Sequence, residues 1–82
     1  MQSNRKIRQF DLYLSSFLSM HGFTPKLFLN GQRISFEFDA SDEVLDLMEK
    51  YSCNALVPVA EYVISVKRLK SKMFEAQRGP QQ

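Results

Sequence analysis

The chain has 82 residues and a formal net charge of +2, with 44% hydrophobic and 24% charged residues. A chain of this length holds one small domain and buries only about 60% of the surface that its unfolded form exposes. The composition excludes a wholly disordered chain, and no apolar run is long enough to cross a membrane. We expect a basic N-terminal arm over residues 1–9, a single domain over residues 10–76 and a flexible tail over residues 77–82.

Charges of opposite sign are separated along the chain. Six of the nine acidic residues lie between Glu37 and Glu49, and the segments on either side of them are basic. The basic residues are Arg5, Lys6 and Arg8 near the start, and Lys67, Arg68, Lys70 and Lys72 near the end. This separation indicates either distinct binding surfaces or the ordinary solvated faces of surface elements.

The first expected helix spans residues 11–21. Its apolar stripe, at three- and four-residue spacing, consists of Phe10, Leu14, Phe17, Leu18 and His21. Asp11 is suited to the N-cap, and Gly22 is suited to the left-handed position after the helix. The segment before this helix, residues 7–10, is either an earlier turn or a short extended lead-in.

A β-hairpin is indicated by Asn30-Gly31, which lies between two apolar runs and suits a two-residue type I′ turn. With these two residues as the loop, Leu29 faces Gln32 and Leu27 faces Ile34. One face then carries Phe23, Pro25, Leu27, Leu29, Ile34, Phe36 and Phe38, and the other carries Thr24, Lys26, Phe28, Arg33, Ser35 and Glu37. A slip of one residue would mix the two faces, so this separation favours the register.

The rest of the chain predicts two more helices and a short strand. The second helix begins at a cap within residues 39–42 and ends at Cys53-Asn54. Residues 55–57 read as a third strand at an edge, because Pro58 cannot donate to a ladder. A long third helix follows Pro58. The expected fold class is α+β: a small antiparallel sheet, made of the hairpin plus a short third strand, packed against three helices in the order α-β-β-α-β-α. The expected core is Phe10, Leu14, Phe17, Leu18, Leu27, Leu29, Ile34, Phe36, Phe38, Val44, Leu45, Met48, Tyr62, Val66 and Leu69.

No arrangement of residues points to catalysis. His21 ends a helical stripe and reads as a core or capping histidine rather than as a base. The single cysteine, Cys53, has no internal disulfide partner and no metal-ligand spacing around it. The acidic segment lacks the glycine that a calcium loop requires. We therefore expect no catalytic residue, metal or cofactor, and a reducing, cytoplasmic location without a signal peptide or membrane anchor.

Nucleic acid is the first candidate partner. Phe28 has Lys26 and Arg33 beside it on one hairpin face, which is the chemistry of a base-stacking platform with phosphate contacts. The basic third helix suits phosphates as well. The candidate residues are Arg5, Lys6, Arg8, Lys26, Phe28, Arg33, Lys67, Arg68, Lys70 and Lys72. In the alternative interpretation, Phe28 packs beneath a helix or against a second copy, and the third helix is an ordinary amphipathic surface helix.

Several segments together resemble a known family. They are Phe10-Asp11-Leu12-Tyr13-Leu14, the following Phe17-Leu18 and Gly22-Phe23, Arg33-Ile34-Ser35-Phe36-Glu37-Phe38, Tyr51, Val57, Tyr62 and Lys67-Arg68-Leu69-Lys70-Ser71. The family is one of short uncharacterised domains, a domain of unknown function, from bacteria and their phages or mobile elements. The resemblance covers residues 7–73. It implies an intracellular accessory protein and supplies no functional residue.

The second candidate function is that of a protein–protein interaction module, a regulator or inhibitor that uses its acidic helix surface. The acidic surface of Asp42, Asp46 and Glu49 offers a basic host protein a field similar to that of a nucleic-acid backbone. A homodimer is also expected, because four large apolar residues fall outside the core stripes: Leu12, Phe28, Ile64 and Phe74. Such a dimer would bury the third helix and the outer hairpin face.

Overall fold

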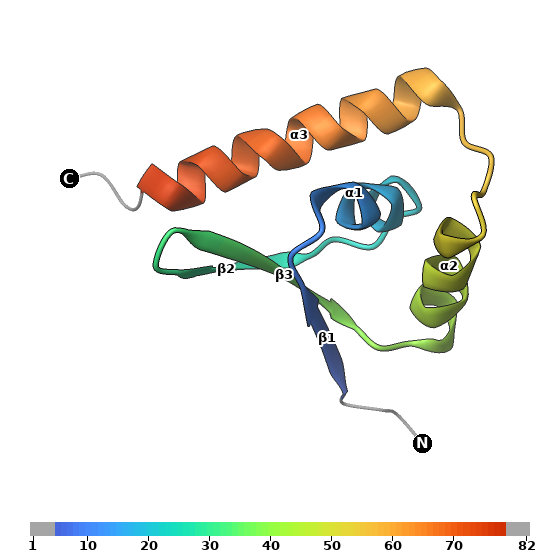
Figure 1. Cartoon of the computed structure of the whole chain (residues 1–82), viewed down its shortest axis with the longest axis horizontal. Helices are drawn as coiled ribbons and strands as arrows, with labels where there is room; N and C mark the ends of the chain where they lie inside the picture. The colour runs from blue at the N-terminus through green and yellow to red at the C-terminus, as the bar shows by residue number, and fades with distance from the viewer. Residues whose placement is uncertain (1–4, 79–82) are drawn as a thin grey trace.

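The structure, a computed structural model, describes residues 5–78. Within this range the chain forms three strands and three helices in the order β-α-β-β-α-α (Figure 1). They are β1 (Lys6–Gln9), α1 (Leu12–Met20), β2 (Lys26–Asn30), β3 (Arg33–Asp39), α2 (Asp42–Ser52) and α3 (Val59–Arg78). The expected α+β class is confirmed, although the order of the elements differs.

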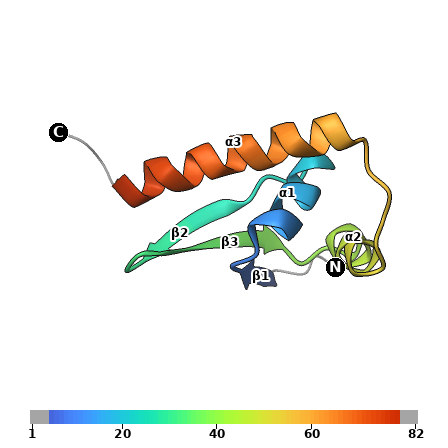
Figure 2. The same cartoon turned by 45° about the horizontal axis from the view of Figure 1, so that its top comes forward.

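The sheet has β3 at its centre, with β1 and β2 antiparallel on either side. Helices α1 and α3 lie on one face of the sheet, and α2 lies beyond one end of it (Figure 1, Figure 2). We call the face that packs against α1 and α3 the inner face, and the opposite one the outer face. In the part of the chain that the structure describes, no helix covers the outer face.

The third strand is β1, and the prediction of a strand at residues 55–57 was wrong. The backbone there completes the end of α2 instead. Asn54 takes a positive φ of 67°, and the Ala55 N–H donates to the Lys50 carbonyl at 3.1 Å. This is a Schellman motif, which uses the first backbone donor of the segment to close the helix. Pro58 then removes another donor, so the segment crosses to α3 without pairing.

The hairpin register differs by two residues from the prediction. Asn30 pairs with Arg33, so the loop is Gly31-Gln32 rather than Asn30-Gly31. The predicted type I′ turn would require a positive φ at both Asn30 and Gly31. Gly31 has a φ of 67°, but the φ of Asn30 is not positive. A glycine alone at positive φ in the first loop position is typical of a type II′ turn. Because side chains alternate with a period of two, this shift leaves every side chain on its predicted face.

The two shorter helices, α1 and α2, begin and end where their sequences predict. The Asp11 carboxylate accepts hydrogen bonds from the N–H groups of Tyr13 and Leu14, at 2.9 and 3.1 Å. Gly22, after the end of α1, has a φ of 99°. The second helix is capped by the hydroxyl of Ser41, which accepts from the Val44 N–H. These local signals confirm the expected start and end of each helix.

The core lies between the inner face of the sheet and the helices. Its buried apolar residues are Phe17, Leu18, Ile34, Phe36, Phe38, Val44 and Leu69. All seven were expected there. Three other expected core residues, Phe10, Leu29 and Leu45, are about half exposed. Leu12, expected outside the core, is half-buried and packs against it.

Part of the expected N-terminal arm, residues 1–9, belongs to the sheet. Residues 1–4 lie outside the described residues, whereas Lys6–Gln9 form β1 and not an unpaired arm. At the other end, α3 continues to Arg78, so the expectation that the tail starts at residue 77 was wrong, and residues 79–82 of the expected tail (77–82) lie outside the described residues. No helix in the described range 5–78 is long and apolar enough to span a bilayer.

Candidate nucleic-acid interface

The outer face is assembled from all three strands. Alternation places Lys6 and Arg8 of β1 on the same side as the charged residues of β3, because Lys6 pairs with Asp39 and Arg8 pairs with Glu37. In β2, Lys26 pairs with Glu37 and Phe28 pairs with Ser35. The outer face thus carries Lys6, Arg8, Phe10, Lys26, Phe28, Arg33, Ser35, Glu37 and Asp39.

Two arginine–phenylalanine stacks dominate this face. The Arg8 guanidinium carbon lies 4.0 Å from the centroid of the Phe28 ring, and that of Arg33 lies 3.9 Å from the centroid of Phe10. A planar guanidinium over an aromatic face gains cation–π attraction and stacking. The Arg8 side chain reaches across β3 to meet Phe28 on β2. Ser35 of β3 is only 4% exposed, although no helix covers it.

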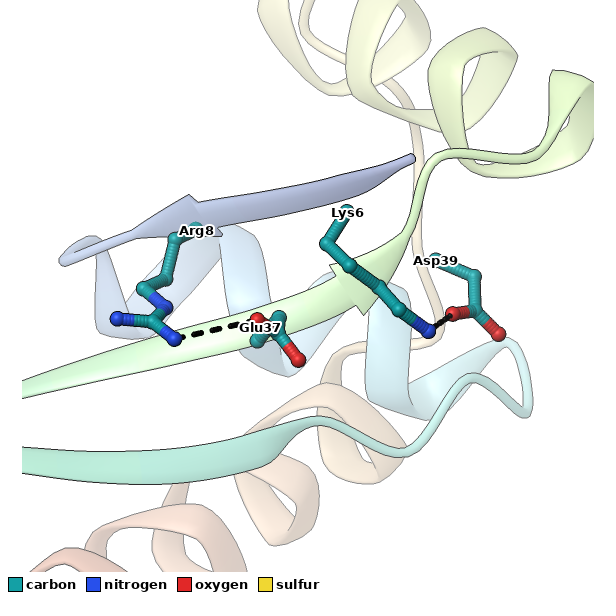
Figure 3. Close-up of polar contacts among 4 residues, drawn as sticks. All are labelled: Lys6, Arg8, Glu37 and Asp39. Carbon is teal, nitrogen blue, oxygen red and sulfur yellow. Dashed lines mark hydrogen bonds and ion pairs between the residues drawn. The ribbon is translucent and has the colours of Figure 1, made fainter. Parts of the chain in front are cut away.

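Ion pairs hold two of the cations along the central strand (Figure 3). Arg8 Nη2 lies 3.3 Å from Glu37 Oε2, and the Lys6 ammonium donates to the Asp39 carboxylate. That hydrogen bond raises the pKa of Lys6 and lowers the pKa of Asp39, with the attraction between the two charges acting in the same direction. Both groups of this second pair are exposed, so solvent screens it.

The outer face keeps an excess of positive charge. It carries four cations, Lys6, Arg8, Lys26 and Arg33, against two carboxylates, which leaves a net charge of +2. Lys26 and Arg33 form no ion pair with any residue of the described range. The charges of Lys26 and Arg33 are therefore not neutralised by an ion pair and can meet an anionic ligand, with Arg33 held in its stack on Phe10.

The structure brings together part of the predicted nucleic-acid set. Lys6 and Arg8 join Lys26, Phe28 and Arg33 on one surface, and Arg5 directly precedes β1. The cation stacked on Phe28 is Arg8, whereas Arg33, expected beside Phe28, stacks on Phe10. The four basic residues of the third helix do not join them. Helix α3 lies on the inner side, and the residues exposed there include Lys67, Arg68, Lys70 and Lys72.

Phe10 is the site residue that sequence reasoning assigned to the core. Its side chain is 52% exposed and lies under the Arg33 guanidinium. A signal for it does exist in the sequence. Phe10 continues the alternation of Lys6 and Arg8, and Asp11 caps the helix only after it, so strand parity governs its direction.

The remaining candidates lie elsewhere. Asp42, Asp46 and Glu49 are exposed on α2, where Asp46 pairs with Lys50 at 3.2 Å. His21 is exposed, ends α1 and meets the Phe17 ring edge-on at 4.8 Å between centroids. Across residues 5–78, no three His, Cys, Asp or Glu side chains gather in a way that could hold a metal ion.

Comparison with known protein families identifies a match over most of the chain. Residues 4–75 match the model of a family described as a domain of unknown function (DUF5659). Neither curated proteins nor solved structures gave a match.

Proposed function

The chain belongs to this family, DUF5659, and we propose from its geometry that it binds single-stranded nucleic acid on the outer face of the sheet. One observation carries the proposal: two arginine–phenylalanine stacks lie on the one sheet face that no described helix covers. The fold class alone does not indicate this function, which depends on the residues of that face.

The chemistry of the face suits unpaired bases. Each base has a flat π surface that stacks on an aromatic ring or on a guanidinium plane, whatever its sequence. The exposed half of Phe10 and the guanidinium groups of Arg8 and Arg33 offer such surfaces. Lys6 and Lys26 at the margins supply charge for the backbone phosphates. In a duplex the base faces are already stacked on one another, so we expect single strands to bind more tightly than duplexes.

The size of the face limits the affinity. Adjacent strands are about 4.8 Å apart, so the three strands place the two stacks within roughly 10 Å of each other. Two or three nucleotides span that distance, and each stacked base contributes about 1–3 kcal/mol. With at most four cations on the face, the slope of log affinity against log salt for single strands is about −3 or shallower. Binding is therefore weak, tolerant of sequence and sensitive to salt.

Fluorescence anisotropy with labelled oligothymidylate and oligouridylate, at two salt concentrations, tests the proposal. We expect saturable binding at low salt and weaker binding at high salt. Phe10→Ala combined with Phe28→Ala should reduce the affinity by tenfold or more, because one lost stack alone costs about 1–3 kcal/mol. Phe74→Ala is the matched control, since Phe74 is an exposed aromatic residue of α3 on the inner side. An absence of binding to DNA and RNA at low salt would overturn the proposal.

A second candidate function uses the acidic surface of α2. Asp42 and Glu49 are exposed and form no ion pair within the described range, so a basic partner can reach them. We propose this interaction role as the alternative function. In either role, we propose that the chain is a non-enzymatic accessory protein. The exposed thiol of Cys53 supports an intracellular, cytoplasmic location. An origin in a bacterium, phage or mobile element stays a prediction from the resemblance.

A further inference from the structure

An exposed stripe of mixed character runs along α3. Val63, Lys67, Lys70 and Phe74 follow one another at spacings of four, three and four residues, which places them on one side of the helix. All four are exposed, and the apolar ones substantially so, at 42% for Val63 and 60% for Phe74. Neither lysine forms an ion pair with a described residue. The stripe therefore offers uncovered apolar surface together with two unpaired positive charges.

The exposed side of α2 carries the opposite pattern. Asp42, Leu45 and Glu49 follow one another at spacings of three and four residues, with Leu45 48% exposed between the two acids. Neither acid forms an ion pair with a described residue. At 1.5 Å per residue, the α2 stripe from Asp42 to Glu49 extends about 11 Å, so it fits within the α3 stripe from Val63 to Phe74, which extends about 16 Å.

We propose that the α3 stripe binds the α2 stripe of a second copy of this chain. Charge complementarity identifies the occupant: the two lysines meet the two carboxylates, and Leu45, which lies between the acids, packs against the aliphatic stems of the lysines. Both stripes are exposed within one chain, so neither is used to cover the other. Because every copy carries both stripes, a two-fold axis closes two such contacts into a dimer.

The contact is small and therefore weak. Specific interfaces commonly engage about 20–30 residues on each side, whereas these two stripes supply seven residues per protomer. We expect association at micromolar concentrations that weakens with salt, because exposed ion pairs are screened. This inference rests on the second candidate function, whose basic partner it names, and it uses no residue of the outer face.

The test is a charge-swap experiment by sedimentation equilibrium. At low salt, the apparent mass of the wild-type protein should rise from 9.6 kDa towards twice that value as the protein concentration increases. Lys67→Glu with Lys70→Glu should abolish the rise, and so should Asp42→Lys with Glu49→Lys. An equimolar mixture of these two variants should associate again, because each then presents the charge that the other's stripe needs.

Arg68→Glu with Lys72→Glu is the matched control, since it makes the same charge change on another flank of α3 and should leave the association intact. Circular dichroism confirms that each variant is folded. A wild-type mass of 9.6 kDa at every concentration overturns the inference, even if α2 binds some other basic protein. Failure of the mixture to associate overturns it as well.

Discussion

The two faces of β3 differ in what covers them. On the inner face, Ile34, Phe36 and Phe38 are almost completely buried beneath the helices. On the outer face, Arg33 and Glu37 alternate with them and are covered only by other side chains of the sheet. Alternate residues of β3 thus pack in the core, and the residues between them form part of the proposed binding surface. Changes on the inner face should affect stability, and changes on the outer face should affect binding.

The largest expected effect is on the inner face. Phe36 has no exposed surface, so Phe36→Ala should reduce the free energy of unfolding by about 3–5 kcal/mol. A domain of this size is stable by only about 5–15 kcal/mol, so this is a large share of its stability. Urea denaturation measures the change. Phe10→Ala, on the outer face, is the control and should cost less than about 1 kcal/mol. Equal losses for the two variants would contradict the assignment of the faces.

An intermediate effect is expected where the chain passes from the outer face into α1. Asp11→Ala removes the carboxylate that accepts from two backbone N–H groups, and it should cost about 1 kcal/mol of stability. Asp11→Asn keeps an acceptor and should recover most of the loss. Urea denaturation of both variants at neutral pH provides the comparison. If the two variants lose the same amount, the cap contributes little.

A smaller effect is expected from the ion pair on the outer face. Glu37→Gln removes the carboxylate that faces Arg8 and should change stability by less than about 1 kcal/mol. The released guanidinium becomes available to phosphate, so the affinity for single strands should rise, by up to about fivefold. Anisotropy titrations of wild type and variant measure this ratio. Asp46→Asn, which breaks the pair with Lys50 on α2, should leave the affinity unchanged.

The smallest effect, seen only in alkali, concerns two tyrosines beside the core. Burial raises the pKa of Tyr51 and Tyr62 above the usual value of 10. A raised pKa means that their contribution to stability is fully present below pH 10 and is lost as the pH rises through the higher folded values. Tyr51→Phe should leave stability at pH 8 nearly unchanged and reduce the loss between pH 8 and pH 11. Urea midpoints at the two pH values measure this difference.

Local signals predicted the helices and the faces of the hairpin, because caps and alternation act within a few residues. The Asp11 cap and the positive φ of Gly22 are examples. An extended segment before α1 was one of two predicted alternatives, but its pairing as strand β1 was not predicted, since its four residues include a single aliphatic one, Ile7, and it pairs with a strand some 30 residues away. Such a pairing leaves little trace in local periodicity.

For the same reason, Lys6 and Arg8 were predicted as candidate residues, but their place beside the hairpin residues was not, and Phe10 was not predicted as a site residue. The hairpin residues Lys26, Phe28 and Arg33 share a face by local alternation. Arg8 and Phe10 join them only through the pairing of β1 with β3. Phe10 also fits the helical spacing of Leu14, so periodicity alone assigned it to the core. Only the position of the Asp11 cap separates the two interpretations.

An NMR titration of isotope-labelled protein with unlabelled oligothymidylate tests the central claim most directly. We expect the largest backbone amide shifts in β1, β2 and β3, at Lys6, Arg8, Phe28 and Arg33, and small shifts along α3. Shifts concentrated on the basic residues of α3, or no shifts at low salt, would contradict the assignment of the outer face as the nucleic-acid surface.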